Sequence, residues 1–264
     1  MTKPHARIDE ADGVVTITLD CEAKRNAISP EVTRTLWTAV RSLAERDDLR
    51  CMLITAVGDY FTAGIDIKAG AGLDRGDPQT RDLRPGWRLR RNYRNHHLLY
   101  DELEAIEKPV VLAAQGTCLG AGVEMALSCD FRFCSPHAEW RLPEIELGVI
   151  PGSGGASRLT RLVGPGWAKY MAVAGMPVGA AQAKTIGLVH DVFPAQTFAE
   201  DVRAFCRRLV HLPAEAVGLA KLAVDLAADI GDRGAQRQVD RLANTTLLTS
   251  EEYRARRARF RASD

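Results

Sequence analysis

The chain has 264 residues, 46% of them hydrophobic, which fits one large α/β domain or a domain with an appendage. Its net charge of +1 excludes the overall positive charge with which many proteins bind nucleic acid or acidic membranes. The six cysteines are scattered and form no CxxC pair and no Cys/His set with zinc spacing, so no metal site is expected.

Nothing in the sequence points to export or to a membrane. Residues 1–5 contain no apolar signal segment, and no uncharged run approaches the length of a membrane span. The final residues, 262–264, carry no peroxisomal address. We therefore expect a soluble, reduced, cytoplasmic protein.

Strand and helix patterns alternate over the first half of the chain. The expected elements are a hairpin at about 7–20, a helix at about 30–46, a strand at 51–55, a loop at about 68–84, a helix at about 85–107 and a strand at 109–114. Ser29 caps the first helix, and Pro30 takes its first position. A loop as long as 68–84 is often a lid or a binding loop.

Helices dominate the second half. The expected elements are a helix that begins near Gly120, strands at 129–134, 140–142 and 188–193, a glycine turn at 151–155, and helices at about 156–163, 165–174, 179–186, 196–211, 214–230, 234–248 and 250–262. Strands stop near residue 195. This predicts a core of residues 1–195 with the active site, and a C-terminal helical region of residues 196–264 for oligomerisation.

The stretch from Leu119 to Ser128 has the features of an anion-binding helix start. Small residues at its opening let a ligand approach backbone amides that have no partner inside the helix. Glu124 lies on the apolar face of the first turn, where an unpaired charge is expensive, so its carboxyl should be neutral or paired. Taken alone, these ten residues favour the plainer interpretation, a strand–turn–helix corner with a capping glutamate.

A second loop has the same character. Phe61-Thr62-Ala63-Gly64-Ile65-Asp66 and Thr117–Gly122 each follow a buried strand and bring small residues to its end. In open α/β folds, ligands bind beyond the carboxyl ends of strands. One backbone amide from each loop could converge on a single oxygen, and each such donor typically contributes roughly 2.7–4 kcal/mol of transition-state stabilisation.

Three motifs resemble, in order and spacing, the signatures of the crotonase, or enoyl-CoA hydratase/isomerase, superfamily: 61–68, 116–124 and 143–155. The resemblance covers nearly the whole chain. It implies an α/β fold of the ClpP/crotonase type, a spiral of β-β-α units closed by C-terminal helices. It also implies a homotrimer or a dimer of trimers.

The resemblance assigns the reacting groups. The amides of Ile65 and Ala121 take the positions of the oxyanion hole, where the family more often has glycine at the second position. The two catalytic glutamates of the hydratase branch fall on Glu124 and Glu144. Keeping both favours a hydratase, since isomerases usually retain one carboxylate or move it.

Two carboxyls suit hydration. One takes a proton from water while a neutral one protonates C2 of the substrate, and two nearby carboxyls push their pKa values apart. By analogy, Glu144 delivers the proton to C2 and Glu124 orients and activates the water. The sequence leaves this division open.

The resemblance also suggests how the substrate binds. Coenzyme A, as part of the substrate and not a cofactor, is expected to contact Lys24 at its phosphates and the loop at its adenine, namely Ala63, Gly64, Asp66, Ile67 and Lys68. The acyl pocket is expected at Trp140, Pro151 and Gly152. The family's proline before the Arg25-Asn26-Ala27 segment is absent here. Arginines within 254–259 either reach a phosphate of a neighbouring subunit or form a solvated helix face.

Neighbouring features have plainer interpretations. Glu146 would point the same way as Glu144 if that segment is extended, but its family position is usually on the surface. The 151–155 turn lacks both the G-x-G-x-x-G spacing and the first glycine of G-x-S-x-G. The adjacent His96-His97 do not share a helix face, which argues against a metal pair.

The expected activity is hydration of a trans-2-enoyl-CoA to a 3-hydroxyacyl-CoA in fatty-acid or related acyl-CoA breakdown. An isomerase, or a specialised acyl-CoA dehydratase or hydrolase of the same superfamily, is the alternative. A non-catalytic RNA-binding scaffold is a more distant one, and the presence of both glutamates argues against it.

Overall fold

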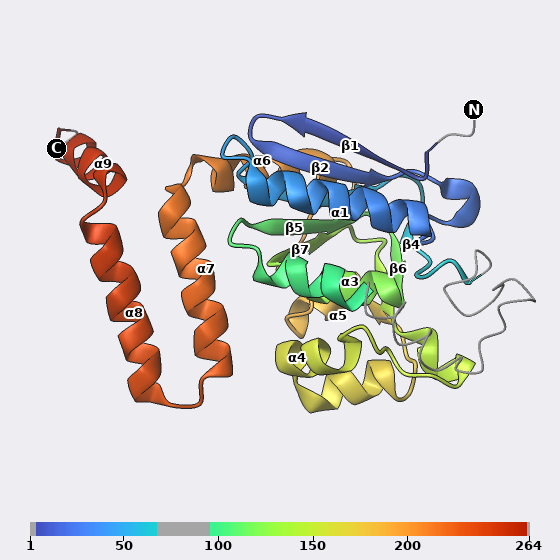
Figure 1. Cartoon of the computed structure of the whole chain (residues 1–264). Helices are drawn as coiled ribbons and strands as arrows, with labels where there is room; N and C mark the ends of the chain where they lie inside the picture. Colours follow the sequence, from blue (N-terminus) through green and yellow to red (C-terminus); the bar gives the residue numbers. More distant parts are fainter. Residues whose placement is uncertain (1–3, 68–95, 263–264) are drawn as a thin grey trace, which may run out of the picture.

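The computed structural model describes residues 4–67 and 96–262 (Figure 1). Within them, two sheets form the centre, a larger one with the order β1-β2-β3-β5-β7-β10 and a smaller one with the order β4-β6-β8-β9. The strands are β1 (Ala6–Ala11), β2 (Val14–Leu19), β3 (Cys51–Ala56), β4 (Tyr60–Thr62), β5 (Val110–Ala114), β6 (Thr117–Leu119), β7 (Phe131–Cys134), β8 (Glu139–Arg141), β9 (Val178–Gly179) and β10 (Asp191–Val192).

The chain passes repeatedly from the larger sheet to the smaller one. Strand β3 leads to β4, β5 leads to β6, and β7 leads to β8. A helical segment follows each pair: residues 96–105, then α3 (Ala121–Leu127), then α4 (Gly155–Ala172). The predicted spiral of β-β-α units is therefore confirmed.

Successive side chains of a strand point to opposite faces of the larger sheet, and both faces are buried. In β3, Met52 and Ile54 enter the main core together with α1 (Pro30–Glu45), while Cys51 and Leu53 face the opposite side. The opposite side is covered by α6 (Phe198–His211). The first helix beyond residue 195 thus packs with the core, and the division at that residue stays a prediction.

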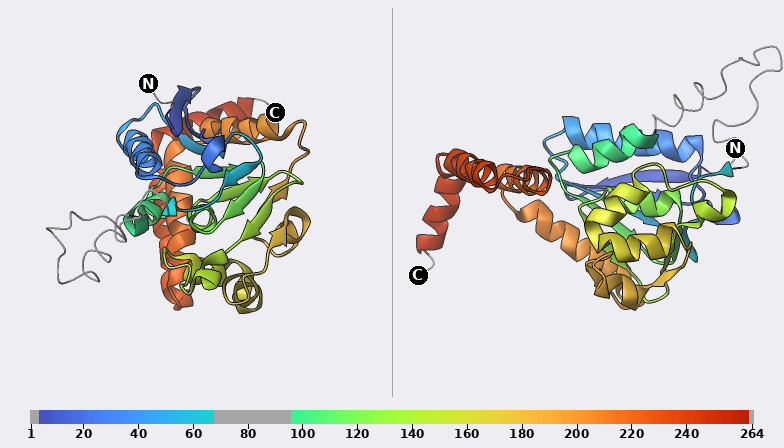
Figure 2. Two further views of the ribbon diagram at one scale, coloured as in Figure 1. Left: turned by 90° about the vertical axis from the view of Figure 1, so that its right-hand side faces the viewer. Right: turned by 90° about the horizontal axis from the view of Figure 1, so that it is seen from below.

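Three helices extend away from the sheets, as the two further views show (Figure 2). They are α7 (Ala214–Asp229), α8 (Arg233–Leu248) and α9 (Glu251–Ala262). Most residues of α7 are apolar, yet only Gly218 is buried within it. Its tie to the core is polar, because Lys221 Nζ donates to Asp130 Oδ2 at 2.9 Å.

One sequence prediction needs correction, and one alternative that the sequence left open is decided. The strand expected at 188–193 is reduced to β10, because Gly187, with a φ of 79°, ends α5 (Ala180–Thr185) in a turn that buries Leu188 and Val189. The segment after β8 is not extended but forms the 3-10 helix Pro143–Leu147. The predicted loop at 68–84 and the first part of the helix at 85–107 lie outside the described residues.

The helix boundaries were otherwise predicted well. The expected break between helices at 163 and 165 is confirmed as a kink in α4 at Gly164, with a φ of 75° and a ψ of 165°. In the part of the chain that the structure describes, every helix is too short or too polar to cross a membrane.

Candidate active site

Parallel strand pairing brings the three sequence motifs to one edge of the smaller sheet. Strand β6 lies between β4 and β8 and is parallel to both. The chain therefore leaves all three strands at the same edge, with Gly64 after β4, Gly120 after β6 and Glu144 after β8. Residues that are far apart in the sequence become neighbours there.

Two backbone amides at this edge are free to bind a ligand. Ala121 opens α3, where an amide has no partner inside the helix. Ile65 pairs with Ile28 in an isolated parallel β-bridge. The residues on either side of Ile65 make the hydrogen bonds of this bridge: Ile28 N donates to the oxygen of Gly64, and Asp66 N donates to the oxygen of Ile28. The amide of Ile65 therefore points away from that partner. Neither amide donates a hydrogen bond to another described residue.

The two amide-bearing loops touch each other. A Cβ built on Gly64 would lie 3.0 Å from the oxygen of Leu119 and 3.5 Å from the nitrogen of Ala121. Gly64 and Gly120 both have positive φ, 85° and 52°, a conformation that glycine adopts without strain. The two loops thus bring together the amides of Ile65 and Ala121 predicted for the oxyanion hole, and that role stays a prediction.

Three side chains that sequence reasoning missed fix these loops. The Thr62 hydroxyl donates to the oxygen of Asn26 at 2.7 Å and accepts from the Gly64 amide at 3.1 Å. The amide group of Asn26 donates to the oxygens of Val57 and Tyr60. Tyr100, fully buried, donates its hydroxyl to the oxygen of Ala121 at 2.9 Å. No local pattern signals the contacts of Thr62 with Asn26, of Asn26 with Val57 and Tyr60, or of Tyr100 with Ala121, because they join distant segments.

The carboxyl of Glu124 is buried and accepts hydrogen bonds from a turn. Its side chain is 4% exposed, and its Oε1 accepts from the amides of Ser153 at 2.6 Å and Gly155 at 3.2 Å. Burial and the nearby charge of Glu144 raise the pKa of Glu124 to about 7, while the two amides and Arg158 act in the opposite direction. Such a carboxyl exchanges a proton readily near neutral pH.

Glu144 faces the start of α3 from the other side. The glutamate is half-buried, and burial raises the pKa of its carboxyl. A Cβ on Gly120 would lie only 2.7 Å from its Oε1. Its Oε2 is buried and has no hydrogen-bond partner among the described residues. A buried acceptor without a partner is available to water or substrate.

Glu146 does not join this pair. The 3-10 helix turns it away, and its exposed carboxylate pairs with the guanidinium of Arg141. The condition under which both glutamates would point the same way, an extended segment, is not met, and the interpretation of Glu146 as a surface residue is confirmed.

The raised pKa of Glu124 gives the unfolding free energy a defined pH dependence. The carboxyl ionises near 4.5 in a flexible chain and near 7 in the folded one, so the folded chain binds more protons in that window and loses stability as pH rises through it. Glu124→Gln cannot ionise. In urea unfolding, we expect the variant to match the wild type near pH 4 and to exceed it by about 3 kcal/mol at pH 8.

The exposed Glu146→Gln change is the control for that measurement, and its difference from the wild type should stay small at both pH values. A stability gain in Glu124→Gln that does not grow with pH would contradict a carboxyl held partly neutral by burial.

The residues expected to bind coenzyme A lie on two adjoining loops. Ala63 N donates to the oxygen of Arg25, and Lys24 Nζ pairs with Asp66 Oδ2 at 3.3 Å. Asp66 is 7% exposed and Ile67 is exposed, while Lys68 lies outside the described residues. These roles stay predictions.

The residues expected at the acyl pocket have two different surroundings. Pro151 is buried, Gly152 is half-buried, and a Cβ on Gly155 would meet both the Pro151 ring and Glu124. Trp140 is fully buried in β8, between Cys118 of β6 and Val178 of β9. Their part in acyl binding stays a prediction.

Two arginines of α9 make contacts within this chain. Arg256 donates to the oxygen of His211 and pairs with Glu252. Arg254 donates to the oxygen of Thr249. A contact with a phosphate of a neighbouring subunit stays a prediction.

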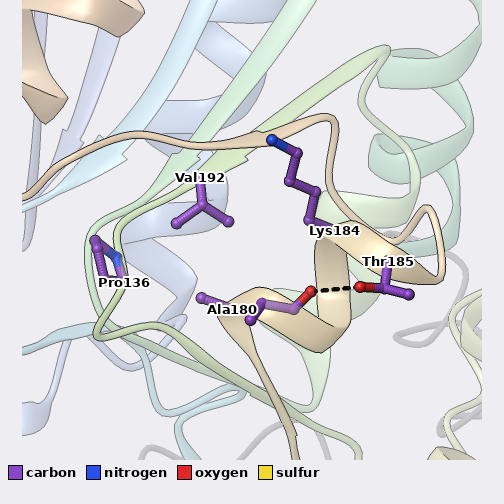
Figure 3. A pocket seen from close by; sticks show the side chains of 6 residues that line it. Pro136, Ala180, Lys184, Thr185 and Val192 are labelled. Atoms are coloured by element: carbon purple, nitrogen blue, oxygen red, sulfur yellow. Dashed lines mark hydrogen bonds between the residues drawn. The ribbon is translucent and has the colours of Figure 1, made fainter.

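An open hollow of about 560 Å³ lies elsewhere on the molecule, between the turn after β7 and helix α5 (Figure 3). It is lined by Pro136, Ala180, Ala181, Lys184, Thr185 and Val192. No predicted site residue is among them, and Lys184 already pairs with Asp191 at 2.6 Å. The hollow is therefore separate from the site described above.

The β-β-α spiral carries, at its strand ends, two amides without a partner among the described residues, one buried carboxyl and one half-buried carboxyl, an arrangement that fits the crotonase class of protein. The family model for enoyl-CoA hydratase/isomerase matches residues 9–261. The chain belongs to this family, which confirms the resemblance and the fold expected from the sequence.

Solved structures and curated relatives agree. An enoyl-CoA hydratase from Bacillus anthracis has a TM-score of 0.89 at 28% identity, over 98% of this chain and 96% of that one. A "Probable enoyl-CoA hydratase echA8" from Mycobacterium bovis is 33% identical, over 86% of this chain and 83% of the relative. The 2,3-dehydroadipyl-CoA hydratase of Escherichia coli is 32% identical, over 91% and 89% respectively.

Proposed function

We propose that the protein is an enoyl-CoA hydratase, which adds water to a trans-2-enoyl-CoA and forms a 3-hydroxyacyl-CoA. The observation that carries this proposal is the pair of shielded carboxyls at the start of α3, Glu124 within its first turn and Glu144 against Gly120. An isomerase moves one proton between two carbons and needs one such group. The hydratase names of the relatives support the same reading.

The proposed reaction uses each group once. The thioester oxygen accepts hydrogen bonds from the amides of Ile65 and Ala121, which stabilise the enolate by roughly 2.7–4 kcal/mol each. Glu124, with its pKa near 7, takes a proton from water as the water oxygen bonds to C3. Glu144 in its neutral form gives a proton to C2. Coenzyme A belongs to the substrate, and the reaction as written needs no other cofactor.

A direct assay separates this function from its alternatives. The purified chain is incubated with crotonyl-CoA, and the loss of enoyl absorbance is followed together with the appearance of 3-hydroxybutyryl-CoA. Hydration supports the proposal. Conversion of a 3-enoyl-CoA to a 2-enoyl-CoA without hydration supports an isomerase. No turnover of any acyl-CoA, together with salt-sensitive RNA binding, supports a scaffold.

Lys24 tests the expected position of coenzyme A. Lys24→Ala should raise KM for crotonyl-CoA about tenfold, because it removes a cation expected at the phosphates, and should leave KM for crotonyl-pantetheine, which lacks the nucleotide, unchanged. Lys184→Ala is the matched control, since Lys184 is equally exposed and also pairs with an aspartate. An equal rise in KM for both substrates would count against the phosphate contact.

We also propose a homotrimer or a dimer of trimers in the cytoplasm. The apolar helix α7 supports assembly, since Val224 is 68% exposed and Leu242 of α8 is 70% exposed. Exposed apolar surface of this kind marks interaction sites. The six cysteines, all free, suit a reducing compartment. The mass of the particle in solution, by light scattering, decides between the two assemblies.

A further inference from the structure

The turn that holds Glu124 is itself held from behind by Arg158. Arg158 Nη1 donates to the oxygen of Ser153 at 3.3 Å, while the amide of the same Ser153 donates to Glu124. A Cβ built on Gly154 would lie 1.9 Å from Arg158 Nη1, so the guanidinium lies directly against the turn. Ser153 therefore contacts Glu124 through its backbone N–H and Arg158 through its backbone carbonyl.

Two carboxylates on a different element fix Arg158. Its Nε donates to Glu104 Oε2 at 2.8 Å, and its Nη2 donates to Asp101 Oδ1 at 2.6 Å. Its side chain is 11% exposed. Charge-assisted bonds to a planar guanidinium fix its orientation, in contrast to a solvated surface pair that contributes little.

The partner helix, residues 96–105, also contacts the other half of the site. Tyr100 lies next to Asp101 in the sequence and donates its hydroxyl to the oxygen of Ala121. One helix thus contacts the oxyanion turn directly and the turn around Glu124 through Arg158.

We propose that Arg158, clamped by Asp101 and Glu104, is a positioning residue that keeps the 153–155 turn and its two amides on the carboxyl of Glu124. This inference rests on the proposed function, in which Glu124 takes the proton from water. Arg158 touches neither water nor substrate in this role, and acts through the turn.

The charges around Glu124 determine in which direction the loss of Arg158 shifts the pKa of Glu124. Glu144 faces it from the 3-10 helix, Tyr100 from the 96–105 helix and Arg158 from α4, and His97 lines the hollow of about 300 Å³ beside Arg158. The amides of Ser153 and Gly155 and the charge of Arg158 all lower the pKa of Glu124. Loss of Arg158 removes its own positive charge and weakens the hydrogen bonds from the amides of Ser153 and Gly155. The pKa of Glu124 therefore rises, and more of its carboxyl is protonated at neutral pH.

The first test is kinetic. Arg158→Met should lower kcat for crotonyl-CoA hydration by roughly 10- to 100-fold through misplacement of Glu124, with KM changed less than about twofold. The acid limb of the kcat/KM profile should move to higher pH. Arg158→Lys keeps the charge without the planar fork, so it should be intermediate.

Arg161→Met is the matched control. Arg161 lies three residues further along α4 and lines the same hollow, but it is half exposed and pairs with Asp229. It should keep both the wild-type kcat and the wild-type acid limb. A loss in Arg161→Met equal to that in Arg158→Met would overturn the proposal, because the effect would then follow from any arginine of the helix.

The second test does not need activity. With ¹³C-labelled glutamate, the carboxyl signal of Glu124 is assigned by its absence in Glu124→Gln and is then titrated. It should titrate at higher pH in Arg158→Met than in the wild type. If the wild type hydrates no enoyl-CoA, the proposed function fails, while this titration still decides the role of Arg158.

Should Arg158→Met fail to fold, the double variant Asp101→Asn/Glu104→Gln replaces it. That variant keeps Arg158 and removes the charged clamp, and it should shift the acid limb and the Glu124 titration in the same direction by less. A folded variant of either kind with unchanged kcat and unchanged titration refutes the positioning role.

Discussion

Glutamine at position 124 or at position 144 lowers kcat for crotonyl-CoA hydration by roughly 10²- to 10⁴-fold, the range typical of a lost acid–base group. Both substitutions keep the size of the side chain and its ability to accept a hydrogen bond. Glu124→Gln still accepts from the amides of Ser153 and Gly155, so the turn stays in place while the proton acceptor is gone.

Glu146→Gln is the matched control for both substitutions, since its carboxylate is exposed and paired with Arg141. It should retain wild-type turnover. Full activity in either the Glu124 or the Glu144 variant would refute a mechanism that uses two carboxyls.

A second measurement on the same variants assigns the two roles. Butyryl-CoA has no double bond to hydrate, but its C2 proton can exchange with D₂O through the same enolate. Glu144→Gln should lose this exchange, because Glu144 is proposed to move the C2 proton, whereas Glu124→Gln should keep most of it. The reverse pattern would exchange the roles of the two glutamates and leave the two-carboxyl mechanism in place.

Gly122→Ala should damage the oxyanion hole by forcing its two loops apart. The added Cβ would lie 2.1 Å from Cγ2 of Thr62, which is fully buried, and 3.2 Å from Sγ of Cys118. We expect a loss of about 1–3 kcal/mol in unfolding free energy from overpacking. Displacement of one amide donor should also lower kcat by roughly 10²- to 10³-fold.

Thr62→Ser offers a specific rescue. Serine lacks Cγ2 but keeps the hydroxyl that donates to Asn26 and accepts from Gly64. The double variant Thr62→Ser/Gly122→Ala should recover most of the lost turnover, while Thr62→Ser alone should stay close to the wild type. Gly166→Ala, where nothing lies within 4 Å of the new Cβ, is the neutral glycine control. A double variant no better than Gly122→Ala would contradict this steric account.

The sequence predicted the groups of the site better than their supports. Glu124, Glu144, Ile65 and Ala121 could be predicted because each lies in a local motif, after a strand, that resembles a signature of the family, and their roles stay predictions. Arg158 and Thr62 were missed, because each also binds a distant residue, Glu104 at 54 residues and Asn26 at 36 residues, which becomes a neighbour only in the folded chain. Helix ends were predicted closely where Pro30 or Gly164 marks them.

The errors have physical causes. The apolar run 188–193 fits a strand by composition, but tertiary packing buries Leu188 and Val189 through a turn after Gly187. The segment 143–148 is too short for its periodicity to separate an extended chain from a 3-10 helix. The apolar sequence of α7 does not reveal whether its own core or another chain covers it.

The smaller sheet has a consequence for how this molecule tolerates change. Adjacent strands lie about 4.7–4.9 Å apart, so β4, β6 and β8 hold their carboxyl ends within about 10 Å of each other whatever the length of chain that joins them. The sheet therefore sets the spacing of Ile65, Ala121 and Glu144, each of which follows one of these strands within three residues. Insertions and deletions in the connecting segments should leave that spacing unchanged where they avoid α3, which carries Glu124, and the 96–105 helix, which carries Tyr100.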